Sequence, residues 1–158
     1  MANLKIQIVT EAKLVPLIEA CAQISERAYP SGTGWKLQAF QADMVADHRV
    51  YAVIHDGEQL IGYVGAVQVL DQVDITGVAV DPAYQKQGHA IRLIEALIAS
   101  LEVNTQVFLE VRESNLAAKH LYQRVGFSAI GVRKAYYSQP DEDAILMKLS
   151  VSGAKGEY

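Results

Sequence analysis

The chain has 158 residues, 51% of them hydrophobic and 20% charged, which predicts a single globular domain over residues 1–150 and a flexible tail over residues 151–158. Its formal net charge of −4 argues against direct nucleic-acid binding, because that function usually needs a basic face. No apolar run is long enough to span a membrane, the first residues lack the apolar segment of a signal peptide, and the one cysteine cannot form an internal disulfide, so we expect a cytoplasmic protein.

The first half of the chain predicts one strand, two helices and a three-stranded meander. Leu4–Val9 alternates apolar and polar residues as a half-buried strand does, and Thr10 is a suitable N-cap for the helix that follows. Cys21 falls on the apolar stripe of that helix, which favours packing over a nucleophilic role. After the turn-rich segment Tyr29 to Gly34, a second helix is predicted from Trp35 to Asp47. The meander strands, the first two joined by an Asp-Gly turn, are Val50–His55, Leu60–Leu70 and Val73–Val80.

The second half predicts two helices and three strands. A helix opens near Gly88 and runs to Leu101, and a later helix has Asn115 as N-cap and Gly126 as its stop. That later helix spans Asn115–Val125, and the predicted strands are Val107–Val111, Phe127–Tyr137 and Ala144–Leu149, the last two around a turn at Gln139-Pro140-Asp141. Together the elements predict an α/β fold with a mixed seven-stranded sheet flanked by four helices.

The stretch from Val78 to Arg92 is the most informative part of the sequence. It predicts the end of a buried strand and then a polar loop that opens a helix, where unpaired backbone N–H groups at the positive end of the helix dipole suit a phosphate. Lys86 adds a cation, while Gly88 and Ala90 let a large anion approach the backbone. The hypothesis is a pyrophosphate cradle, and the alternative is an ordinary strand-to-helix turn with a glycine for close packing.

Two motifs resemble one family of enzymes. The pattern Gln85-x-x-Gly88-x-Ala90 resembles the acetyl-CoA signature Gln/Arg-x-x-Gly-x-Gly/Ala of the GCN5-related N-acetyltransferases (GNAT), with Ala90 where a second glycine is usual. The run from Leu109 to Phe127 resembles the RimI subfamily of ribosomal-protein alanine N-acetyltransferases, as do the segments Val132–Tyr137 and Glu142–Met147. The resemblance implies the GNAT fold, with the sheet splayed between strands four and five, and direct attack of an amine on acetyl-CoA in a ternary complex.

Two residues are candidates for the chemistry. Glu110 lies between apolar residues of a strand, so its carboxylate needs either a salt-bridge partner or a wet cleft. The resemblance implies that it is the general base, acting directly or through water. Tyr122 fits a helix-flank packing position on spacing alone, whereas the resemblance implies that it protonates the departing CoA thiolate. Because thiols are more acidic than phenols, we expect its help to be mostly a hydrogen bond to developing negative charge.

The resemblance also implies a set of binding residues. Asn115 is expected both to cap its helix and to touch the cofactor. The implied acetyl-CoA contacts are Val78, Ala79, Val80, Lys86, Gln87, Gly88, His89, Ala90, Ile91 and Asn115. The implied acceptor contacts are Trp35, Tyr136 and Tyr137, although two adjacent strand residues point to opposite faces, so at most one of the tyrosines lines a given pocket. The four histidines share no metal-ligand spacing, so no metal is expected.

The acceptor is expected to be a peptide or protein N-terminus, possibly the N-terminal alanine of a small-subunit ribosomal protein. RimI-like chains carry Pro and Trp side by side in the first inter-helix loop, whereas Ser31 to Gly34 separate Pro30 from Trp35 here and change the acceptor mouth. A lysine, a polyamine or an antibiotic amine therefore stays open as acceptor. So do a non-catalytic acetyl-CoA-sensing module and a structural protein with an incidental glycine loop, and the oligomeric state, monomer or dimer, is open.

Overall fold

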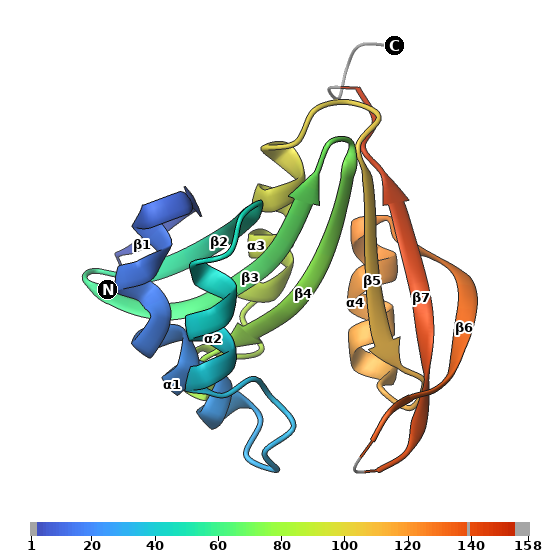
Figure 1. Cartoon of the computed structure of the whole chain (residues 1–158), viewed down its shortest axis with the longest axis horizontal. Coiled ribbons are helices and arrows are strands. Elements are labelled where there is room, and N and C mark those ends of the chain that lie inside the picture. Colours follow the sequence, from blue (N-terminus) through green and yellow to red (C-terminus); the bar gives the residue numbers. More distant parts are fainter. Residues whose placement is uncertain (1–2, 139, 154–158) are drawn as a thin grey trace.

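The computed structural model describes residues 3–138 and 140–153. Its seven strands form one mixed sheet with helices on both faces (Figure 1). The strands are β1 (Leu4–Thr10), β2 (Arg49–Asp56), β3 (Gln59–Val69), β4 (Gln72–Val80), β5 (Gln106–Arg112), β6 (Ser128–Tyr137) and β7 (Glu142–Ser150). The helices are α1 (Ile18–Ala28), α2 (Leu37–Met44), α3 (His89–Ala99) and α4 (Leu116–Val125), with two 3-10 segments, η1 (Glu11–Leu17) and η2 (Pro82–Tyr84). The predicted α/β architecture is confirmed.

The sheet opens between its two parallel strands. Its order is β1-β2-β3-β4-β5-β7-β6, and β4 with β5 is the one parallel pair. That pairing covers only Gln72–Asp74 against Gln106–Phe108, after which the two strands diverge toward their carboxyl ends (Figure 1). The backbone of β4 from Ile75 to Val80 is therefore not paired with β5, and the predicted splay is confirmed.

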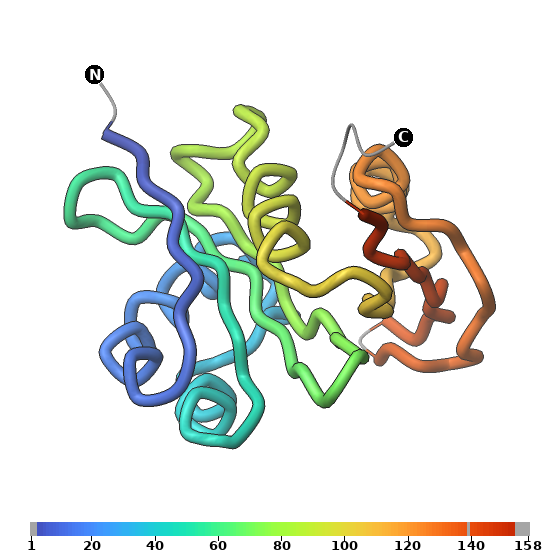
Figure 2. Tube along the Cα trace, turned by 90° about the horizontal axis from the view of Figure 1, so that it is seen from above, coloured from blue at the N-terminus to red at the C-terminus, as the bar shows by residue number. Residues whose placement is uncertain are grey.

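Helices α1 and α2 cover one face of β1 to β4, and α3 covers the opposite face, with α4 beside α3 behind β5 (Figures 1 and 2). This arrangement explains the continuous apolar run in β2. Ala52 and Ile54 pack into the core under α3, whereas Tyr51 and Val53 pack into a second core under α1 and α2. A strand that is covered on both faces buries every side chain, so its sequence loses the usual alternation.

The first helical segment differs from the prediction. Thr10 is the last residue of β1, and its side chain makes no capping hydrogen bond. A 3-10 segment, η1, follows, with Pro16 inside it, and regular α-helix begins only at Ile18. Proline has no N–H group to donate to a preceding turn, so the α-helical hydrogen-bond ladder starts after it. Cys21 is fully buried in α1, as the predicted packing role requires.

The second helix is shorter than the predicted Trp35 to Asp47. Lys36 is extended and α2 ends at Met44, so Trp35 lies outside the helix and packs edge-on against Phe40 with ring centroids 5.4 Å apart. That aromatic contact holds the loop before α2 against the core. Gln139 and residues 154–158, which belong to the predicted turn and tail, lie outside the described residues. None of the helices in the described part of the chain has both the length and the apolar character needed to cross a membrane.

A buried carboxylate anchors α2 to the sheet. Asp43 accepts a hydrogen bond from the Tyr51 hydroxyl at 2.6 Å and another from Arg49 Nε at 2.7 Å. Burial, followed by this hydrogen bond, raises the pKa of Tyr51, so the phenol donates throughout the neutral range. The contacts fix the carboxyl end of α2 on β2.

Replacing Asp43 with Asn should lower the free energy of unfolding by about 1.5–2 kcal/mol, because the amide still accepts from Tyr51 but no longer carries the charge that pairs with Arg49. Urea denaturation measures the change. Asp47→Asn removes the same charge from an exposed side chain of the same segment, so it should change the stability by less than about 0.5 kcal/mol. An equal loss in both variants would contradict a specific role for Asp43.

Candidate active site

The loop between β4 and α3 is tied down at its first residues. Asp81 is buried, and its carboxylate accepts from the Ala83 N–H at 3.1 Å and from the guanidinium of Arg27 in α1. Gln85 Nε2 donates to the carbonyl of Val80 at 2.9 Å. These contacts fold the loop back onto the end of β4, so the start of α3 is held close to the point where the sheet splays.

Gly88 makes the start of α3 an open backbone site. It is the N-cap at φ +82°, a left-handed conformation that favours glycine, and no side chain caps the helix there. The first helical bond runs from Arg92 N–H to the Gly88 carbonyl at 3.1 Å, so the N–H groups of His89, Ala90 and Ile91 precede the helical ladder. Such groups suit an anion, as the sequence predicted.

The side chains of this loop divide into two groups. Lys86 and Gln87 are exposed beside the helix start. His89 is buried, with Nδ1 2.7 Å from Nη1 of Arg92, and burial lowers its pKa. Because the imidazole and its Nε2 atom are buried, the group that His89 offers to an anion at the surface is its backbone N–H.

A cavity of about 300 Å³ lies where β4 and β5 separate. Its lining comes from α1, the loop before α2, α2, the four strands β2 to β5, α4 and the end of β6. Six of the predicted site residues meet in it, namely Trp35, Val78, Glu110, Asn115, Tyr122 and Tyr137. These six residues are far apart in the sequence, and the fold brings them together in one cavity.

Glu110 has both a salt-bridge partner and access to a cavity, the two alternatives that its position in an apolar strand predicted. It lines the cavity, and its Oε1 atom lies 3.2 Å from Nε of Arg133 in an ion pair. The side chain of Glu110 is 24% exposed and that of Arg133 is 53% exposed, so solvent reaches the pair. The carboxylate has a cation as partner and still faces open space.

Tyr122 and Asn115 reach the cavity from α4. The ring of Tyr122 packs edge-on against Phe127 with centroids 5.9 Å apart, and burial raises its pKa. Its hydroxyl therefore stays protonated in the neutral range and is able to donate a hydrogen bond. Asn115 Oδ1 accepts from the Ala118 N–H at 3.1 Å, which confirms the predicted N-cap.

The two adjacent tyrosines of β6 are placed differently. Tyr137 lines the cavity, and burial raises its pKa to about 12. Tyr136 is 52% exposed, and the Arg133 guanidinium lies 5.9 Å from the centre of its ring. The structure thus distinguishes the two residues that sequence reasoning left equivalent.

Sequence reasoning missed Tyr29, which closes one side of the cavity. Its hydroxyl donates to the Val78 carbonyl at 2.7 Å, across 49 residues of chain. Val78 belongs to the stretch of β4 that has no strand partner on the β5 side, so the phenol satisfies a carbonyl at the splayed edge. No local pattern around Tyr29 indicates this contact, because it depends on how α1 docks on the sheet.

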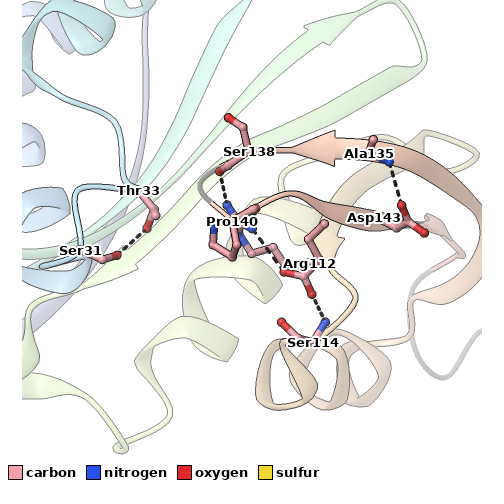
Figure 3. Close-up of polar contacts among 9 residues, drawn as sticks. Ser31, Thr33, Arg112, Ser114, Ala135, Ser138, Pro140 and Asp143 are labelled. Atoms are coloured by element: carbon pink, nitrogen blue, oxygen red, sulfur yellow. Dashed lines mark hydrogen bonds and ion pairs between the residues drawn. The ribbon is translucent and has the colours of Figure 1, made fainter.

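Arg112 was also missed, although it lies two residues from Glu110. Its guanidinium donates to the Ser138 carbonyl at 3.1 Å and to the Pro140 carbonyl at 3.0 Å (Figure 3). It also stacks 4.5 Å from the centre of the Tyr137 ring. Glu142 reinforces this junction by pairing with Arg112 and accepting from the Ser114 N–H. Arg112 thereby ties the β6–β7 hairpin to the end of β5 and fixes Tyr137.

A second cavity of about 540 Å³ adjoins the first. Ser25, Tyr29, Gly34 and Trp35 line both. A side chain at Gly34 would lie 2.6 Å from Ser25 Oγ, so this part of the loop is seated directly on α1. Of the four residues between Pro30 and Trp35, Gly34 therefore lines both cavities, while Thr33 lines the first and Gly32 the second.

Comparison with known proteins gives one family. Residues 16–127 match the Acetyltransferase (GNAT) family. The chain is 41% identical over 97 residues to "[Ribosomal protein bS18]-alanine N-acetyltransferase" of Haemophilus ducreyi, covering 58% of this chain and 67% of that protein. It is 34% identical over 139 residues to the Escherichia coli K12 protein of the same name, covering 85% and 92%.

The fold agrees with the sequence comparison. The crystal structure of the ribosomal-protein-S18-alanine N-acetyltransferase from Escherichia coli superimposes with a TM-score of 0.82 at 30% identity, covering 98% of this chain and 99% of that one. The splayed sheet, the glycine-capped helix after β4 and the family match lead to the same conclusion. The chain is a member of the GNAT family of acetyltransferases.

Proposed function

We propose that this protein transfers the acetyl group of acetyl-CoA to the α-amine of an N-terminal alanine, with the small-subunit ribosomal protein bS18 as its acceptor. The proposal is supported by the relatives from Haemophilus ducreyi and Escherichia coli whose names state that activity. The observation that carries the chemistry is that Glu110 and Tyr122 line one cavity at the opening of the sheet.

The chain's own residues fit acetyl-CoA as co-substrate. The N–H groups at the start of α3, with Lys86 beside them, would hold the pyrophosphate. The edge of β4 at Val78–Val80 has no strand partner on the β5 side, and its backbone N–H groups would meet the pantetheine arm in the manner of an added strand, because the Val78 and Val80 carbonyls already accept from Tyr29 and Gln85. Asn115 lines the adjoining cavity. Acetyl-CoA supplies the activated acetyl thioester.

Glu110 would act on the amine. An ammonium has no lone pair for attack. Deprotonation at pH 7 costs about 1.4 kcal/mol for an α-amine with pKa near 8, against about 4.6 kcal/mol for a lysine side chain with pKa near 10.4. Glu110, directly or through one water, accepts the proton, and the free amine then attacks the thioester carbon. Because an α-amine loses its proton at a lower free-energy cost than a lysine side chain does, a weak base such as Glu110 favours an N-terminal acceptor.

Tyr122 would act at the other end of the reaction. As the carbon–sulfur bond breaks, negative charge develops on the sulfur, and the Tyr122 hydroxyl donates a hydrogen bond to it. The position of the two residues supports separate roles at the amine and at the sulfur, because Glu110 reaches the cavity from β5 and Tyr122 reaches it from α4.

Two peptides of equal composition test the acceptor. One has a free N-terminal alanine and no free lysine amine, and the other has a blocked N-terminus and one free lysine. Mass spectrometry with acetyl-CoA should show a gain of one acetyl group on the first peptide alone. Acetylation of the second alone would overturn the N-terminal assignment, and no acetylation of either, despite an acetyl-CoA-dependent rise in Tm, would indicate a small-amine acceptor or a sensing role.

A further inference from the structure

We propose that Arg133 sets the acceptor affinity of this site: its guanidinium holds the Glu110 carboxylate in the free enzyme, and the acceptor's ammonium must displace it. The inference rests on the proposed function, because it takes Glu110 as the group that receives the amine. Its starting observation is the ion pair between Arg133 Nε and Glu110 Oε1 at 3.2 Å.

The pair bridges two strands that are not neighbours. β7 lies between β5, which carries Glu110, and β6, which carries Arg133. Ala144 of β7 is the register partner of both Arg112 and Arg133. Partners in an antiparallel pair point to the same face, and so do residues two apart on one strand, so Glu110, Arg112 and Arg133 share one face of the sheet. On this face of β7, Ala144 lies opposite Arg133, and Leu146 lies opposite Glu110.

This shared face is the open one. Leu109, Val111 and Met147 point the other way, into the core under α3 and α4. Among the described residues, no helix covers β5, β7 and β6 on the face that carries Glu110, as Figure 1 shows. An acceptor peptide that approaches Glu110 from this face therefore meets the Arg133 guanidinium first.

The two arginines beside Glu110 differ in how firmly they are held. Arg112 donates to two hairpin carbonyls (Figure 3), and it also pairs with Glu142 and stacks on Tyr137, so its guanidinium is fixed. Arg133 has the ion pair with Glu110 and the nearby Tyr136 ring, and its side chain is more than half exposed. Solvent-exposed ion pairs are weak, so an incoming cation is able to replace this one.

Displacement has a chemical consequence. The Arg133 guanidinium lies 3.2 Å from Oε1 of Glu110, and its positive charge repels an ammonium that approaches the same carboxylate, so the two cations compete for Glu110. The released guanidinium is able to stack on the ring of Tyr136, whose centre lies 5.9 Å from Cζ of Arg133 in the free enzyme. Arg133 thus lowers the affinity for the acceptor amine without taking part in the acyl transfer.

Replacing Arg133 with Met tests the proposal. The KM for the alanine peptide should fall about twofold to fivefold, the range that a weak exposed ion pair supports, while kcat and the KM for acetyl-CoA stay within twofold. The Kd of the same peptide for the enzyme saturated with CoA, which cannot react, should fall by the same factor. Arg133→Lys keeps a cation on the strand and should lie between wild type and Arg133→Met.

Lys134→Met is the matched control, because it removes one positive charge from the neighbouring position of β6, where Lys134 pairs with Asp143 instead of Glu110. It should leave the peptide KM unchanged, which excludes a general effect of net charge. An unchanged or higher peptide KM and Kd in Arg133→Met, with wild-type acetylation intact, would overturn the role of Arg133 and leave the proposed function standing. A wild-type enzyme that acetylates no alanine peptide would overturn both.

Discussion

Replacing Glu110 with Gln should lower kcat/KM for an alanine peptide by about 10²- to 10⁴-fold at pH 7, the usual contribution of a positioned general base. Glutamine keeps the size of the side chain but cannot accept a proton. Steady-state kinetics with the alanine peptide measure the loss. The Kd of acetyl-CoA should not change, because its proposed contacts are the start of α3, the edge of β4 and Asn115.

The pH dependence of the loss identifies the proton that Glu110 removes. At pH 7 an α-amine with pKa near 8 is about nine-tenths ammonium, whereas at pH 9 it is about nine-tenths free amine. The variant reacts only with the free amine, so its deficit should shrink about tenfold over this range. A deficit that stays constant from pH 6 to pH 9 would remove Glu110 as the base.

Glu113→Gln is the matched control for this measurement. Glu113 lies directly beyond the end of β5 and is exposed, so its substitution makes the same chemical change a short distance along the chain. Wild-type kinetics in that variant and an unchanged Tm in Glu110→Gln would assign the loss to chemistry. Because Glu110→Gln also breaks the pair with Arg133, the Tm comparison separates a folding effect from a catalytic one.

The parts of the site that the sequence predicted are those encoded by local pattern. The N-cap at Asn115 and the glycine-capped start of α3 each depend on residues within four positions along the chain. Glu110 was found because a carboxylate in an apolar strand needs an explanation wherever that strand lies. The splay of the sheet entered through the family resemblance, since no single stretch encodes how far two parallel strands stay paired.

The parts that sequence reasoning missed depend on which strands become neighbours. Arg133 reaches Glu110 only because β7 inserts between β5 and β6 and because the β6–β7 register shifts between Ala129 and Gly131. The register shifts again, by two residues, between Arg133 and Tyr137, and this shift places Tyr137 opposite Glu142. A register change of one residue reverses the face of every side chain that follows, so contacts of this kind cannot be read from periodicity.

The start of the first helix also could not be predicted from periodicity. Thr10 has the right residue type for an N-cap, and the apolar spacing that follows is helical, yet Pro16 delays the α-helix to Ile18. The apolar stripe itself was correct, since Leu14, Cys21 and Ile24 are fully buried. Periodicity reports which side of a segment faces the core, whereas the hydrogen-bonding groups decide where the helix begins.

Replacing Tyr122 with Phe should lower kcat by about ten- to 100-fold and leave both KM values within a factor of about three, because the lost hydrogen bond forms only as charge develops on the leaving sulfur. Full proton transfer from the phenol is not expected. A thiol has pKa near 8.5 against about 10 for a free phenol, so transfer is uphill by about 2 kcal/mol. Burial raises the pKa of Tyr122 and widens that gap.

The raised pKa also fixes the pH profile of this variant. Tyr122 stays protonated from pH 6 to pH 9, so its hydrogen bond is present throughout, and the loss in Tyr122→Phe should be the same at every pH in that range. This constancy distinguishes it from Glu110→Gln, whose deficit shrinks as the pH rises. Tyr136→Phe removes a hydroxyl from a half-exposed tyrosine outside the cavity lining and should leave kcat unchanged. A loss in Tyr122→Phe larger than that in Glu110→Gln would mean that departure of the thiol, and not deprotonation of the amine, limits the reaction.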